Sequence, residues 1–226
     1  MKERPILFTG PMVRAILDGR KTVTRRVMKP QPMPSKSGGH HWPCKVHQSM
    51  LHIERELQNG EGCWCGLAEA ACPYGQPGDR LWVRETWTDV NMCGAPALAY
   101  RADEDIRDLM EEPGFLDDRG AFNYDDPRVK PYPFACWYAE LDQARWRPSI
   151  HMPRWASRIL LEVTAVRVER LHDLSDPGAL AEGVSHSEMH SGDSLVDVFA
   201  RLWESTGGDW AANPWVWVVE FKRVTP

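Results

Sequence analysis

The residues best equipped for chemistry lie in one short run, Gly19–Arg26, which reads Gly-Arg-Lys-Thr-Val-Thr-Arg-Arg. Its cationic residues are Arg20, Lys21, Arg25 and Arg26. The fork of an arginine side chain suits phosphate better than the point charge of a lysine does. By residue type alone, the run predicts contact with phosphate, and an ordinary solvated surface explains it equally well.

Charge is distributed unevenly along the chain. Residues 1–30 hold eight basic and two acidic residues, whereas residues 101–126 hold ten acidic and three basic residues. The net charge of −5 therefore conceals a basic end and an acidic segment. A basic face attracts phosphates even on an anionic protein, so a nucleoside or single-stranded nucleic acid is a candidate partner.

The cysteines and histidines raise the question of a metal. Cys44 and His47, together with Cys63 and Cys65, have the ligand types of a zinc site. However, the Cys-x-Cys spacing of Cys63 and Cys65 suits zinc less well than Cys-x2-Cys does. This pair also lacks a second pair of ligands at the spacing that zinc sites usually have. We therefore expect no cofactor, and favour reduced thiols in a variable loop over a structural zinc.

Two patterns concern membranes and export. No run of apolar residues approaches the roughly 20 that a membrane helix needs. The first residues lack the apolar core of a secretion signal. We expect a cytoplasmic protein with no membrane partner.

A helix is predicted directly before the basic run. Apolar spacing predicts that helix over 11–18, and Gly19 suits the position just past its end. The β-branched residues 22–24 then favour an extended chain. Residues three apart on a regular strand point to opposite faces, so Lys21 and Thr24 can meet only if the chain turns between them.

Other patterns predict the remaining elements. Alternating or apolar segments predict strands at 5–9, 80–87, 98–101, 134–140, 157–170 and 215–221. One slip in the alternation of 157–170 indicates a bulge. Caps and apolar spacing predict helices at 48–58, 175–183 and 193–206. Five prolines predict a loop at 29–45.

The sequence predicts several strands with four helices between them, but no regular succession of βαβ units. This order predicts an α+β fold, a small β-barrel with surrounding helices. We expect a single domain over 1–226, with long insertions at about 30–75 and 102–133. Glu85 lies on the core side of its predicted strand, where it is either an inward partner for an arginine or an edge charge.

Several motifs resemble the ASCH family, a branch of the PUA-like superfamily linked to RNA binding. Gly19–Arg26 is similar to the family signature Gly-x-Lys-x-x-[Glu/Thr]-x-Arg. Further segments resemble the family in the same order, at 77–83, 158–164, 181–184 and 217–221. The chain looks most like phage- and prophage-encoded ASCH proteins, which carry long insertions after the signature. The resemblance implies a PUA-like barrel.

One ASCH subgroup bears on mechanism. Small bacterial enzymes with a signature similar to this one hydrolyse the amide of N4-acetylcytidine to cytidine and acetate. The resemblance implies that Lys21 is the catalytic lysine, Thr24 the nucleophile and Glu182 the catalytic glutamate. A threonine hydroxyl needs an adjacent base, a lysine acts as a base only with a lowered pKa, and a carboxylic acid can protonate the leaving amine.

The leading interpretation is therefore a hydrolase that acts on N4-acylated cytidine. Its candidate substrate-binding residues are Arg20, Arg25, Arg26 and Glu85. Because Arg25 and Arg26 are neighbours on a predicted strand, at most one of them reaches a shared pocket. The alternative is a non-catalytic RNA- or DNA-binding module in which the basic run grips phosphate. A ribonuclease is a third hypothesis, and no carboxylate cluster or histidine pair in the sequence specifically supports it.

Overall fold

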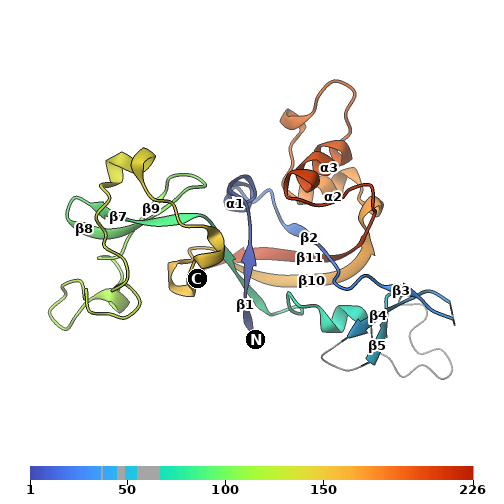
Figure 1. Ribbon diagram of the computed structural model, residues 1–226, viewed down its shortest axis with the longest axis horizontal. Coiled ribbons are helices and arrows are strands. Elements are labelled where there is room, and N and C mark those ends of the chain that lie inside the picture. The colour runs from blue at the N-terminus through green and yellow to red at the C-terminus, as the bar shows by residue number, and fades with distance from the viewer. Residues whose placement is uncertain (37, 45–48, 55–66, 226) are drawn as a thin grey trace. The chain divides into compact units, whose positions relative to one another are not determined.

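A computed structural model describes residues 1–36, 38–44, 49–54 and 67–225, with the backbone alone at 44, 49 and 50. These residues form strands and a few short helices, which confirms the predicted α+β class (Figure 1). Their strands form three sheets, and no closed barrel is found among them. No helix in this part of the chain is long and apolar enough to cross a membrane.

The largest sheet has the strand order β1-β6-β10-β11-β2. Its strands are β1 (Glu3–Leu7), β2 (Val23–Val27), β6 (Arg80–Arg84), β10 (Leu160–Arg170) and β11 (Trp215–Val224). The second sheet consists of β3 (Met33–Pro34), β4 (His40–Cys44) and β5 (Ser49–His52). The third consists of β7 (Trp87–Met92), β8 (Ala95–Tyr100) and β9 (Ile106–Asp108).

Helices connect these strands. The α-helices are α1 (Gly10–Leu17), α2 (Asp176–Ala181) and α3 (Leu195–Ser205). Short 3-10 helices are η2 (Ala68–Ala71), η3 (Pro113–Phe115), η4 (Tyr138–Gln143), η5 (Ser149–His151), η6 (Arg154–Ala156), η7 (Leu171–Asp173) and η8 (His186–Glu188). The predicted helices at 11–18, 175–183 and 193–206 are thus confirmed as α1, α2 and α3.

The chain packs into two compact units, which are described separately. Unit 1 comprises Met1–Arg4, Ala15–Leu81 and Leu160–Thr225, and unit 2 comprises Pro5–Arg14 and Trp82–Ile159. Strands β1 and β6 and helix α1 each continue from one unit into the other. The expectation of a single domain stays a prediction.

Strand β11 is the central strand of unit 1. It pairs antiparallel with β10 on one side and with β2 on the other. Its residues 216–219 are almost fully buried, as their continuous apolar sequence predicts. The register of β10 shifts between Val163 and Ala165, which confirms a bulge in this strand, although the apolar alternation of the sequence breaks only after Ala165.

Helices α2 and α3 pack against the face of β11 that carries Val216 and Val218. In α3 the residues that reach this core are spaced at three and four, as in any amphipathic helix. They are Leu195, Val198, Phe199 and Trp203. The same core includes Val23 of β2, so α2 lies over the β2 face that carries the odd-numbered residues.

Three predicted elements are wrong. The described part of the predicted helix at 48–58 contains strand β5, because the segment pairs with β4. The loop predicted at 29–45 contains β3 and β4. The strand predicted at 134–140 is absent, since Phe134 has a positive φ of 47° and η4 begins at Tyr138.

Unit 2 holds an aromatic core beneath the β7-β8-β9 sheet. Its buried members include Trp87, Tyr100, Phe115, Phe122 and Phe134. The acidic segment expected as an insertion supplies two of these rings, since Phe115 and Phe122 lie inside 102–133. The apolar residues of that segment are therefore part of the folded core of this unit.

Asp79 ties the first residues to the turn before β6 within unit 1. Its carboxylate accepts hydrogen bonds from Arg4 Nη1 at 2.9 Å and from the Lys2 amide at 2.8 Å. The Arg4 bond and the Lys2 amide lower the pKa of Asp79 to about 2.

This lowered pKa predicts a loss of stability in acid. Because the folded pKa lies below the usual 3.8, the contribution is present above that value and is lost as the pH falls toward about 2. Denaturant unfolding at about pH 5 and about pH 3 measures it. We expect Asp79→Asn to reduce the difference between the two pH values, and an unchanged difference would contradict the interaction.

Candidate functional site

Helix α1 and the turn after it position Lys21. Gly19, with φ of 74°, follows the helix as the sequence predicted, and its amide donates to the Ile16 carbonyl at 3.1 Å. The amides of Arg20 and Lys21 both donate to the Ala15 carbonyl at 2.9 Å. The last turn of the helix thus fixes the Lys21 backbone two residues before β2 begins.

Helix α2 positions Glu182 in the same unit. The sequence allows either Ser175 or Asp176 as the cap of this helix, and in the structure the Ser175 side chain accepts from the Gly178 amide. Glu182 follows the last helical residue, and its amide donates to the carbonyls of Gly178 and Ala179 at 3.1 Å.

Gly183 allows Lys21 and Glu182 to approach each other. It has φ of 95°, a conformation that favours glycine. A Cβ at this position would lie 2.8 Å from the Ala15 Cβ and 3.0 Å from the Lys21 Cβ. The glycine predicted to end the helix therefore also makes room for the lysine beside it.

Lys21 and Glu182 form a buried ion pair. Lys21 Nζ lies 2.5 Å from Glu182 Oε2, and the two side chains are 0% and 2% exposed. The amine also donates to the carbonyl oxygens of Glu182 and Val23, each at 2.8 Å. Residues 161 positions apart in the sequence are thus joined at one point.

Arg25 extends this pair into a network. Its Nη1 lies 3.2 Å from Glu182 Oε1, and its Nη2 lies 2.7 Å from Glu169 Oε1 on β10. Arg25 itself is 5% exposed. Two cations and two carboxylates therefore alternate at this site, so their formal charges cancel.

Burial sets the protonation behaviour of Lys21. It lowers the pKa of the amine below 10.5, because the charged form loses its hydration. The carboxylate of Glu182 opposes this effect, and the nearby charges of Arg26 and Arg25 add to it. Such a combination of burial and one specific charge partner is typical of functional sites.

Thr24 lies on β2, where it pairs with Val219 and is 3% exposed. Its side chain and that of Arg25 point to opposite faces of the strand. The Lys21 amine is 2.8 Å from the Val23 oxygen, which standard peptide geometry places about 2.3 Å from the Thr24 nitrogen. The amine therefore lies within about 5 Å of the Thr24 backbone, and the role of Thr24 stays a prediction.

The other two cations of the run, Arg20 and Arg26, make different contacts. Arg20 is exposed, and its side chain donates to the Gly183 carbonyl and to Asp18. Arg26 pairs with Trp217 across the sheet, on the face of β2 opposite to Arg25. Arg25 contacts the carboxylates directly, and the charge of Glu182 also acts on Arg26. The expectation that at most one of the two arginines reaches a shared pocket stays a prediction.

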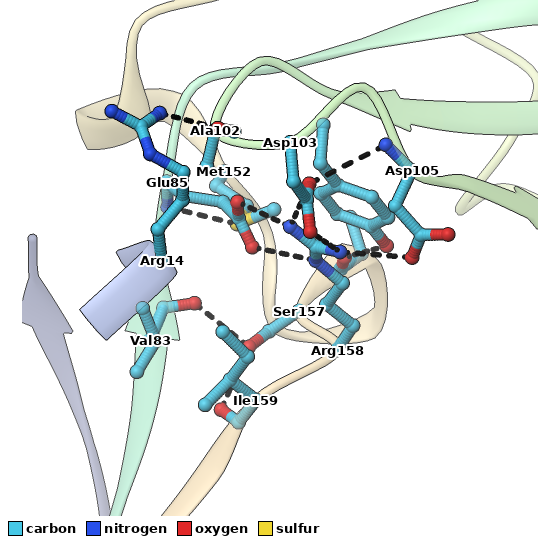
Figure 2. Close-up of polar contacts among 12 residues, drawn as sticks. Arg14, Val83, Glu85, Ala102, Asp103, Asp105, Met152, Ser157, Arg158 and Ile159 are labelled. Carbon is cyan, nitrogen blue, oxygen red and sulfur yellow. Dashed lines mark hydrogen bonds and ion pairs between the residues drawn. The ribbon is translucent and has the colours of Figure 1, made fainter. Parts of the chain in front are cut away.

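Glu85 belongs to unit 2 and makes a different ion pair. Figure 2 shows the Arg158 guanidinium held by Glu85, Asp103 and Asp105. Two parallel hydrogen bonds of 2.9 Å join Arg158 to Glu85, and the guanidinium also lies 4.1 Å from the Tyr100 ring centre. Glu85 is thus an inward partner for an arginine, and that arginine is Arg158.

The sequence-based zinc candidates lie outside the described residues. His47, Cys63 and Cys65 are not described, and only the backbone of Cys44 is. Among the residues that are described, no group of three or more histidine, cysteine or acidic side chains is placed to hold a metal ion.

Two residues of these networks were not singled out from the sequence. Glu169 lies near the polar end of β10. The sequence indicates only that it shares a strand face with Arg167, two residues earlier, which it also contacts. Arg158 lies within a motif that resembles the ASCH family, but its carboxylate partners are more than 50 positions away. Neither partnership follows from local sequence.

Comparisons of the chain with protein-family models, with curated proteins and with solved structures return no match. The resemblance to ASCH proteins therefore depends on the motif residues alone. The Lys21 network does not depend on that resemblance, because it is defined by contacts that the structure shows within unit 1.

Proposed function

We propose that unit 1 hydrolyses the amide of an N4-acylated cytidine, and that the chain is an ASCH-type protein with a PUA-like fold. The observation that carries the proposal is the 2.5 Å contact of Lys21 Nζ with Glu182 Oε2, at two buried side chains. Lysine and glutamate are almost never fully buried unless paired. These are also two of the three residues that the resemblance selects as catalytic, the third being Thr24.

The contact provides a route for one proton. The Lys21 amine donates to three acceptors, one of which is the Glu182 carboxylate. Burial lowers the pKa of Lys21, and a proton that moves from Lys21 to Glu182 leaves a neutral amine and a neutral acid. Arg25 opposes this transfer because it stabilises the Glu182 carboxylate. A neutral amine is a base, and a protonated carboxyl is an acid.

These two groups suit amide hydrolysis by a threonine. The Thr24 hydroxyl attacks the acyl carbonyl while Lys21 accepts its proton. The bond between the acyl carbon and N4 breaks, and Glu182 donates its proton to N4, which releases cytidine. Water then cleaves the acyl ester of Thr24, restoring the hydroxyl and releasing the carboxylic acid.

The contacts favour this proposal over a module in which the whole basic run grips phosphate. Arg25 and Lys21 already donate to carboxylates and are almost fully buried. Of the four cations in the run, Arg20 is the most exposed. The proposed partner is a nucleoside or a nucleotide of single-stranded RNA. We place the reaction in the cytoplasm, where the free thiols of Cys72, Cys93 and Cys136 remain reduced.

The test compares the wild-type protein with Glu182→Gln on N4-acetylcytidine. The amide cannot donate the proton that the leaving amine needs, so we expect kcat to fall about 10²–10⁴-fold while KM changes little. Glu162→Gln is the matched control, because Glu162 pairs with Lys222 at the surface of the same unit. A folded wild-type protein that binds single-stranded RNA and leaves N4-acylcytidine intact would favour the binding module.

A further inference from the structure

Strands β4 and β5 of unit 1 lie side by side (Figure 1), and their pairing brings two histidines together. His41 and His52 are directly opposite each other in the antiparallel pair. The Ile53 amide donates to the His40 carbonyl at 3.1 Å, which makes His41 and His52 a non-hydrogen-bonded pair. Side chains at such pairs lie closer together than at hydrogen-bonded pairs. The backbone register therefore directs both imidazoles to one point.

The two rings meet through the same atom. The Nε2 atoms of His41 and His52 are 3.2 Å apart, and the rings are inclined at 50° with their centres 4.2 Å apart. For a hydrogen bond between the two nitrogens, a separation of 3.2 Å is at the long end of the usual range. Two imidazole nitrogens bound to one tetrahedral zinc ion, at about 2.0–2.1 Å each, are about 3.3 Å apart, so the spacing of the nitrogens fits a shared ion. The ring centres of such a pair would lie about 5 Å apart, so the rings must turn slightly to point both nitrogens at the ion.

We propose that His41 and His52 form a two-histidine site for a divalent transition-metal ion, with zinc as the expected occupant. Imidazole nitrogen is a ligand that zinc, copper and nickel accept, whereas magnesium and calcium prefer oxygen. His52 is 4% exposed, so its ring is held in place by packing before any ion arrives.

This site differs from the zinc site considered from the sequence. It uses a cross-strand pair of histidines and none of Cys44, His47, Cys63 or Cys65. Two protein nitrogens leave two positions of a tetrahedral ion for water or another ligand. The ion also cross-links β4 and β5, so its binding stabilises the folded hairpin.

The test titrates zinc chloride into the full-length protein after treatment with a chelator and desalting. We expect the wild-type protein to bind zinc with an affinity that falls at least about tenfold in His41→Ala, since one of two protein ligands is lost. His40→Ala is the matched control, because His40 is the next residue on β4, points to the other face and contacts Glu54. Its zinc affinity should remain that of the wild type.

A second measurement keeps the test independent of folding defects in the variants. The side-chain NMR signals of the eight histidines are followed as zinc is added to the wild-type protein. The proposal predicts that the signals of His41 and His52 shift together at the lowest zinc concentrations. Zinc that is not taken up, or uptake that leaves these two signals and the His41→Ala affinity unchanged, would overturn it.

Discussion

Replacing Lys21 by methionine is expected to lower the free energy of unfolding by about 3–5 kcal/mol. The substitution keeps the length of the side chain but removes the positive charge, which leaves the Glu182 carboxylate buried with Arg25 as its remaining partner. A buried charge that loses its partner destabilises a protein more than an exposed one does, because water cannot replace the partner. Denaturant unfolding measures this loss.

Two further variants isolate the pair. Arg20→Met alters the preceding residue, whose side chain is 45% exposed, and should change stability by no more than about 0.5 kcal/mol. The double variant Lys21→Met, Glu182→Met should cost less than the sum of its single variants, because neither charge remains uncompensated. A Lys21→Met loss as small as that of Arg20→Met would contradict the buried ion pair.

Replacing Thr24 by valine should reduce hydrolysis of N4-acetylcytidine by at least about a thousandfold. Valine has nearly the shape of threonine, so the change removes the proposed nucleophile with little change in side-chain volume. Thr24→Ser keeps a hydroxyl and should retain part of the activity. Thr22→Val is the matched control, since Thr22 lies in the same run and is exposed. Turnover that survives Thr24→Val would mean that the nucleophile is another group.

Local sequence predicted the elements that carry the site. Gly19 after α1, a cap at the start of α2 and a bulged strand at β10 each depend on neighbouring residues, and the structure confirms all three. The β-branched residues after the helix likewise predicted the extended chain of β2. Short-range rules of capping and periodicity were sufficient for these elements.

Long-range pairing explains what the sequence did not predict. The spacing of Met50, Ile53 and Leu57 fits a helix, yet 49–52 is a strand because pairing with β4 provides its hydrogen bonds. The contacts of Arg25 with Glu169 and of Arg158 with Glu85 cross 144 and 73 positions. Many acidic residues were available as partners for either arginine, and only the folded chain selects among them.

The ultraviolet spectrum of N4-acetylcytidine incubated with the wild-type protein shows directly whether Lys21, Thr24 and Glu182 form a hydrolytic site. We expect the spectrum to change to that of cytidine while an equal amount of acetate is released. The melting curve of the same sample verifies that the protein is folded. A folded protein that leaves the spectrum of N4-acetylcytidine unchanged would contradict the claim.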